Sequence, residues 1–205
     1  MPSKGITRVF TIDSVESLEH FRGVRGDGIL SVYLDDAIDF DKLKAVYEAR
    51  KGFDNRARDS WHLLLPHKGK LTPEDPEGYV ARRSRMNRFH PDPNLYDLSL
   101  AENICDDFDL SLSDLPLIAF ADPDGKGALF AWSFKDTSRE EMLSCIRDIA
   151  IIANRPRERM NHISERTRKE ILHEIKAMKL GKAALRHGAL VAGAARGISK
   201  LILTH

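Results

Sequence analysis

Four aspartates lie close together in the sequence and form its densest group of side chains that could bind a cation. They are Asp35, Asp36, Asp39 and Asp41. Carboxylate oxygens are the ligands that Mg²⁺ and Ca²⁺ prefer, so the group is a candidate metal site. Its spacing matches no calcium-binding loop, and no glycine-rich phosphate loop accompanies it. The alternative is a solvated turn in which Asp39 caps the helix that follows.

A second group combines basic and aromatic side chains. It consists of Arg82, Arg83, Arg85 and Arg88 beside Phe89. Guanidinium groups pair with phosphate oxygens, and a phenyl ring can stack on a base. The group is therefore a candidate contact for nucleic acid or phosphate. The alternatives are a solvated loop, or a loop that pairs with the acidic part of the chain.

The cysteines and histidines predict no reactive or metal site. Cys105 and Cys145 are too few for a disulfide framework, and both fall in amphipathic patterns, where we expect small buried side chains. The eight histidines show no zinc spacing, and no Gly-x-Ser-x-Gly turn is present to expose a nucleophile. We therefore expect no metal and no cofactor, and the sequence favours a non-catalytic protein.

The charges of the 205-residue chain are divided unevenly, although the net charge is only +1. Residues 155–205 hold 12 Lys and Arg against four Asp and Glu, a net charge of +8. Residues 1–154 hold the other 20 basic and 27 acidic residues, a net charge of −7. A basic segment favours an anionic partner, such as nucleic acid or a membrane surface. It can equally pack on the acidic part of its own chain or of another copy.

Periodicity predicts an α/β domain over residues 1–154. With 42% hydrophobic residues the chain can bury one core, and no apolar run approaches the roughly 20 residues of a spanning helix. With no secretory signal pattern at the start, we expect a cytoplasmic location. A capping box is expected at Thr137–Glu140. Strands are predicted at 6–12, 29–34, 61–65, 117–120 and 128–132, and helices at 13–23, 39–59, 95–108 and 139–154, with a long loop at 66–94.

This order of elements resembles the thioredoxin fold. The local matches are residues 11–18, which resemble the first strand and helix, residues 30–34, which resemble the central strand, and residues 113–120. In the last of these, Pro116 stands where the family has a cis-proline before an apolar strand. The resemblance thus implies a central mixed sheet with flanking helices, a cis peptide bond at Pro116, and a partner-binding role for this proline.

The chemistry of the family is not carried over. Thioredoxins place Cys-x-x-Cys at the start of the helix after the central strand, where the helix N-terminus lowers the thiolate pKa. Here the corresponding residues 37–40 are Ala-Ile-Asp-Phe, and no cysteine occurs between residues 29 and 60. The resemblance therefore implies a redox-inactive member of the superfamily.

The segment 155–205 is predicted as a basic helical extension. Residues 157–180 show helical spacing, and beyond them Ala189, Gly193 and Gly197 recur at every fourth position. Small residues at this spacing allow close helix packing, whereas each glycine costs an isolated helix about 1 kcal/mol relative to alanine. A packing partner, a membrane surface or the absence of a helix would each explain the pattern.

We therefore expect a non-catalytic interaction or adaptor protein. Its C-terminal helices would mediate self-association or docking of a protein partner, with Gly193 and Gly197 in the interface. One alternative is a nucleic-acid-binding protein that uses the basic tail together with the segment from Arg82 to Arg88. The other alternative is a peripheral protein whose tail lies on an anionic membrane surface.

Overall fold

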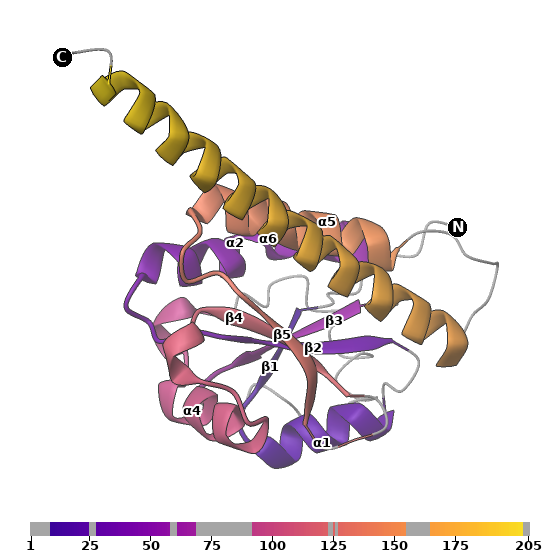
Figure 1. The fold of residues 1–205 in the computed structure, drawn as a ribbon. Coiled ribbons are helices and arrows are strands. Elements are labelled where there is room, and N and C mark those ends of the chain that lie inside the picture. The colour runs from indigo at the N-terminus through magenta and orange to yellow at the C-terminus, as the bar shows by residue number, and fades with distance from the viewer. Residues whose placement is uncertain are drawn as a thin grey trace.

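A computed structural model describes residues 9–24, 28–57, 61–68, 92–122, 125, 127–154 and 165–202. The fold is α/β, with helices on both faces of a central mixed sheet (Figure 1). At this level the predicted fold class is confirmed.

The sheet has five strands in the order β1-β3-β2-β4-β5. Strands β1, β2 and β3 are mutually parallel, β4 is antiparallel to β2, and β5 is antiparallel to β4. The connections from β1 to β2 and from β2 to β3 each contain a helix, as crossovers between parallel strands of one sheet usually do. The strands are β1 (Val9–Ile12), β2 (Ile29–Leu34), β3 (Trp61–Pro66), β4 (Leu117–Ala121) and β5 (Ala128–Ser133).

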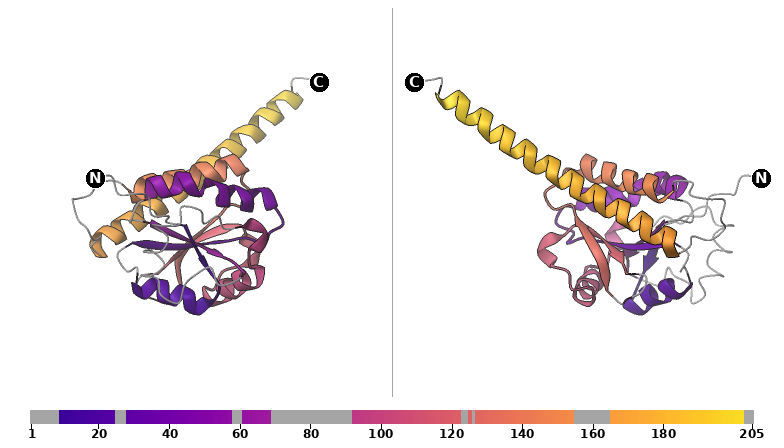
Figure 2. Two further views of the ribbon diagram at one scale, coloured as in Figure 1. Left: turned by 180° about the vertical axis from the view of Figure 1, so that it is seen from behind. Right: turned by 45° about the vertical axis from the view of Figure 1, so that its right-hand side comes forward.

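Helices cover the two faces of the sheet unequally. Helices α1 (Val15–Val24) and α4 (Leu98–Asp107) lie on one face. Helices α2 (Phe40–Ala57), α5 (Arg139–Ala153) and α6 (Glu165–Ile202) lie on the other (Figure 2). Because both faces are covered, every residue of β2, β3 and β4 is buried.

Aromatic and sulfur side chains fill the core. Trp61 stacks on Phe120 at a centroid distance of 6.3 Å, and its indole Nε1 donates to Ser31 Oγ at 2.7 Å. Cys105 and Cys145 are free thiols with no exposed surface, so the prediction that both are small core residues is confirmed. Burial raises the pKa of the Cys105 thiol to about 11, which makes this thiol a poor nucleophile.

The start of α5 differs by one residue from the predicted capping box. Ser138 is the N-cap, and its hydroxyl accepts a hydrogen bond from Glu141 N. Thr137 was expected in this role, but its hydroxyl donates instead to the carbonyl of Phe134 at 2.7 Å. The hydrogen bond to Phe134 holds Thr137 in the turn between β5 and α5, so the helix begins after the next hydroxyl.

Helix α6 is one continuous element of 38 residues, about 57 Å long at the usual rise per residue. Its first half packs on the domain, where Ile171, Leu172 and Ile175 are buried in the common core. The C-terminal part of α6 extends beyond the sheet and α5 (Figures 1 and 2). No helix among the described residues has the combination of length and apolar character that crossing a bilayer requires.

Candidate functional site

One edge of the sheet gathers three loops. The parallel strands β2 and β3 both end there, and β4 begins there because it runs antiparallel to β2. The segment after β2, the short 3₁₀ helix Pro93–Leu95 before α4, and the 3₁₀ helix Leu112–Asp114 before β4 meet at this edge. Open α/β sheets commonly bind ligands beyond the carboxyl ends of their parallel strands.

Asp35 is the central polar residue of this edge and has no exposed surface. Its carboxylate accepts hydrogen bonds from the Tyr33 hydroxyl and from Ala37 N, the latter at 2.7 Å, while its own N donates to Tyr96 Oη at 2.7 Å. Burial raises the pKa of Asp35, although the bonds from Tyr33 and Ala37 oppose this effect. Burial also raises the pKa of Tyr33 and Tyr96 well above 10, so both keep their hydroxyl protons.

The four aspartates do not form one site. Asp36 accepts from Ile38 N at 3.0 Å, and Asp41 is exposed on α2. Asp39 accepts from Lys42 N at 3.3 Å, so the prediction that it caps this helix is confirmed. Among the described residues, no three His, Cys, Asp or Glu side chains come together as a metal site.

Pro116 lies beside Asp35. Leu34 pairs with Leu117, so the residues next to them in the two strands, Asp35 and Pro116, are neighbours at the sheet edge. The Leu115–Pro116 bond is cis, which confirms the conformation that the resemblance implied. The ring of Pro116 is buried, and its carbonyl accepts from Phe134 N at 2.7 Å.

The exposed apolar groups near this edge belong to the first turns after β2. Ile38 is 85% exposed, and Phe40 at the start of α2 is 40% exposed. Ala37 precedes them with a φ of 56°, a left-handed conformation that costs a residue with a Cβ about 1–2 kcal/mol. The turn therefore directs Ile38 outward while Asp35 stays inside.

Other buried polar groups of the described residues have no hydrogen-bond partner. They are the hydroxyls of Thr11 in β1 and Tyr47 on α2, and both ring nitrogens of His67, which follows β3. Burial lowers the pKa of His67, so the ring is neutral at pH 7. The pKa of Tyr47 is raised by burial and by the negative charges of Asp92 and Asp35. Tyr47 therefore keeps its hydroxyl proton, and neither it nor the neutral His67 is a charged nucleophile.

Three residues that form contacts at this edge were not predicted from the sequence. Tyr33 and Tyr96 were included only in their strand and helix patterns, yet both bind Asp35. Lys42 was assigned no role from the sequence, and its ammonium group reaches the carbonyl of Lys135 at 3.3 Å and Asp39 at 3.4 Å. One signal was available for Tyr33, because residues two apart in a strand point to the same face.

Helix α6 is held on the domain by two lysines that were not predicted to have a role. Lys179 Nζ donates to the carbonyl of Ala131 in β5 at 2.6 Å. Lys182 Nζ forms an ion pair with Asp148 of α5 at 2.7 Å and donates to Cys145 Sγ at 3.4 Å. Burial lowers the pKa of Lys182, but these hydrogen bonds outweigh burial and leave it raised. The first part of the basic segment therefore packs on its own acidic domain.

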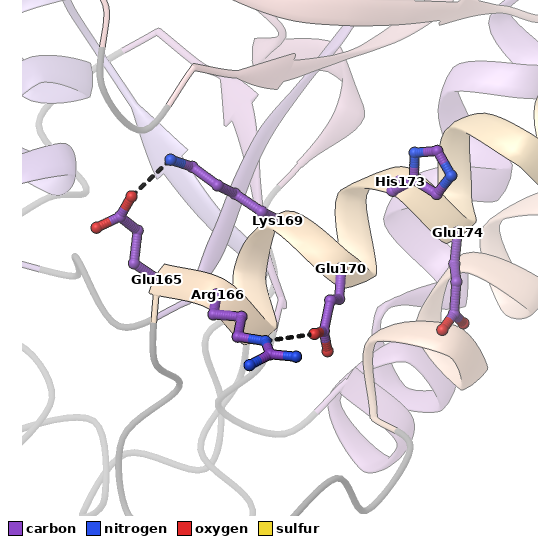
Figure 3. Close-up of a pocket in the computed structure, with 6 residues that line it drawn as sticks. All are labelled: Glu165, Arg166, Lys169, Glu170, His173 and Glu174. Atoms are coloured by element: carbon purple, nitrogen blue, oxygen red, sulfur yellow. Dashed lines mark hydrogen bonds and ion pairs between the residues drawn. The ribbon is translucent and has the colours of Figure 1, made fainter.

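An open pocket lies along the first turns of α6 (Figure 3). Its side chains form ion pairs one helical turn apart, between Lys169 and Glu165 at 2.5 Å and between Arg166 and Glu170 at 3.1 Å. His173 also lines it and is exposed. Pairs at this spacing stabilise an exposed helix surface, and their charges are already compensated. The pocket is therefore no candidate for a ligand site.

The remaining predicted partner-binding residues fall into two groups. Arg82, Arg83, Arg85, Arg88 and Phe89 lie outside the described residues. Gly193 and Gly197 lie in α6, which continues as a helix through both of them. The tail is therefore helical at these positions, and the alternative that it forms no helix is wrong.

Three comparisons with known proteins give no significant match, whether to a protein-family model, a curated protein or a solved structure. Function therefore has to be inferred from the residues and the geometry described above.

Proposed function

We propose that this chain is a non-catalytic interaction protein that docks to other protein chains, including copies of itself, through the distal part of α6. The observation that carries the proposal is the arrangement of α6. Ile171, Leu172 and Ile175 fix its first half to the core, and the helix continues in line beyond the domain. Most of the stability of a helix in a protein comes from packing of one face, and the glycines of the distal part weaken it further, so this part of α6 needs a packing partner.

The character of the domain supports a binding role over catalysis. At the sheet edge, Asp35 is buried and fully hydrogen-bonded, and Lys42 is occupied by carbonyl groups and Asp39. Both cysteines are buried within helices α4 and α5. The exposed Ile38 and Phe40 provide an apolar surface here, which we propose as a secondary contact for a peptide.

We further propose that the domain has a thioredoxin-like arrangement that has lost its redox function. The strand order β1-β3-β2-β4-β5 and the placement of Pro116 immediately before β4 support this proposal. Residues 37–40 occupy the turn between the central strand and α2 and contain no cysteine. Dithiol–disulfide exchange at this turn is therefore excluded by the residues themselves.

Affinity capture with and without the distal helix tests the proposed function. The full chain and a chain ending at Ala183, which keeps the buried anchors of α6, are each immobilised and exposed to an extract of the native host. We expect proteins, including native copies of this chain, that bind the full chain and are absent from the shortened one. Identical sets on both would contradict the proposal, and so would captured nucleic acid alone, released by salt.

A further inference from the structure

The segment from Asp92 to Pro116 carries only negative charge. It contains seven Asp and Glu residues and no Lys or Arg. Asp92 and Asp97 cap the 3₁₀ helix and α4, where they accept from Asn94 N and Leu100 N. The other acidic side chains of the segment have no capping role in the structure, so a local structural need does not explain them.

The surface formed by this segment, which we term the α4 surface, is exposed. Burial lowers the pKa of Lys179 of α6, and Asp114, at the end of this surface, lies near enough for its negative charge to oppose this effect, whereas the carboxylates on and just after α4 have no counter-charge within the described residues. Leu95, Leu98 and Leu112 are 44%, 37% and 47% exposed, so the surface also carries apolar groups. The carboxylates on and just after α4 belong to Glu102, Asp106, Asp107 and Asp109. All four are exposed, and none of them forms an ion pair within the described part of the chain.

Helix α6 has the opposite charge. From residue 175 to the C-terminus there are six Lys and Arg and no Asp or Glu. Lys179 and Lys182 are used in contacts with the chain's own β5 and α5. Arg186, Arg196 and Lys200 lie further along α6, toward the end that extends beyond the domain.

The two complementary elements of one chain point away from each other. Helix α4 covers the sheet face opposite to α5 and α6, and the distal part of α6 leaves the domain from that opposite face, pointing away from the sheet (Figures 1 and 2). Since α6 is straight and anchored at Ile171 and Ile175, it cannot fold back onto its own α4 surface. Direct pairing of two α6 helices would bring like charges together, which is unfavourable.

We propose that the distal part of α6 docks on the α4 surface of a second copy of this chain. This inference rests on the proposed function and names its partner. Leucines and carboxylates of the α4 surface then meet the apolar and basic residues of the helix. If the exchange is reciprocal, two identical interfaces close a symmetric dimer, and if it is not, copies add head to tail.

Charge reversal on each side tests the inference with the full chain. The first variant carries R186E, R196E and K200E on α6. The second carries E102K, D106K and D107K on α4, where positive charge near the helix C-terminus also suits the helix dipole. A control, K44E with K135E and R147E, changes exposed basic residues away from α4 and from the distal part of α6, and alters the net charge by the same amount as the first variant.

Sedimentation equilibrium measures the dissociation constant of each variant. We expect both triple reversals to weaken self-association by about tenfold or more, as three lost charge pairs imply, and the control to leave it within about threefold. An equimolar mixture of the two variants should recover an affinity close to that of the unmodified chain, because each acidic helix then meets a basic α4 surface. Higher salt should also weaken the self-association of the unmodified chain, because it screens the charges at the interface.

The outcomes separate this inference from the proposed function. If reversal on α6 weakens association while reversal on α4 has no effect, the helix docks elsewhere and only the inference is overturned. If the full chain is monomeric and sediments with phosphatidylcholine–phosphatidylserine vesicles, a lipid surface is the partner and the inference is also overturned. If removal of the distal helix changes neither mass nor captured proteins, the proposed function fails as well.

Discussion

Asp35 has a role in the structure that its position in the sequence does not indicate. In the sequence it belongs to a group of acidic residues, whereas in the fold it is enclosed and bonded to Tyr33 and Ala37 N. A carboxyl whose pKa is raised in the folded state holds its proton more tightly when folded than when unfolded. Its contribution to stability is therefore largest below about pH 3.8, and it decreases as the pH rises through the raised folded pKa.

The substitution Asp35→Asn tests this account of the sheet edge. The amide keeps an acceptor for Ala37 N and cannot ionise, so we expect the free energy of unfolding to fall less between pH 4 and pH 7 than in the unmodified chain. Urea denaturation at several pH values gives this difference. Asp107→Asn, at an exposed aspartate at the end of α4, is the control and should show the same fall as the unmodified chain. Equal pH dependence in D35N and the unmodified chain would contradict the buried, bonded carboxyl.

His67 gives a second prediction, with the opposite sign. Its pKa is lowered by burial, so the unfolded chain binds a proton below about pH 6.5 that the folded chain does not. Stability should therefore fall as the pH drops from 6.5 toward the lowered folded pKa. His67→Phe should reduce this loss when melting temperatures at pH 7 and pH 5 are compared, and His173→Ala, at an exposed histidine, should not. An unchanged loss in H67F would show that His67 is not enclosed.

Local patterns explain which residue roles could be predicted. The cap at Asp39 and the burial of Cys105 and Cys145 follow from nearby residues and from helical spacing. The role of Asp35 does not, because Tyr96, which binds its N, is distant in the sequence and reaches it only through the fold. The displaced cap at Ser138 has a similar cause, since the carbonyl of Phe134 binds the hydroxyl of Thr137.

At the level of elements, the strands and most helices could be predicted because their periodicity is strong. Helix α6 was less predictable beyond Leu180, where glycines recur at positions 181, 188, 193 and 197. Glycines disfavour an isolated helix, and the neighbouring residues do not indicate which contacts offset this cost. The structure shows that the helix is continuous and that its first half shares the core of the domain.

The anchor of α6 can be tested by two truncations of apolar side chains on the same helix. Ile175 is fully buried, so Ile175→Ala should lower the free energy of unfolding by about 2–4 kcal/mol through the lost burial and the cavity. Leu180→Ala, where the side chain is 62% exposed, should change it by less than about 0.5 kcal/mol. Urea denaturation of both variants provides the measurement, and equal effects would show that α6 does not pack on the domain through this face.

On the scale of the whole molecule, the net charge of +1 describes neither part of the chain. Exposed carboxylates on α4 have no counter-charge within the described residues, and α6, the helix of the basic segment, lies on the opposite face and extends beyond the domain. Part of this basic segment is neutralised within the chain, through Lys182 and Asp148. The proposed interaction uses the remaining basic residues of the segment. A protein with little net charge can therefore still associate through oppositely charged surfaces.

Light scattering of the full chain and of a chain ending at Ala183 tests the central claim most directly. The shortened chain keeps Ile171, Leu172, Ile175 and Lys182, so it retains every described contact of α6 with the domain. The account predicts that the full chain has a mass above its monomer value of 23.2 kDa, which falls on dilution, and that the shortened chain is monomeric. Identical monomer masses for both, with no protein partner lost on truncation, would contradict it.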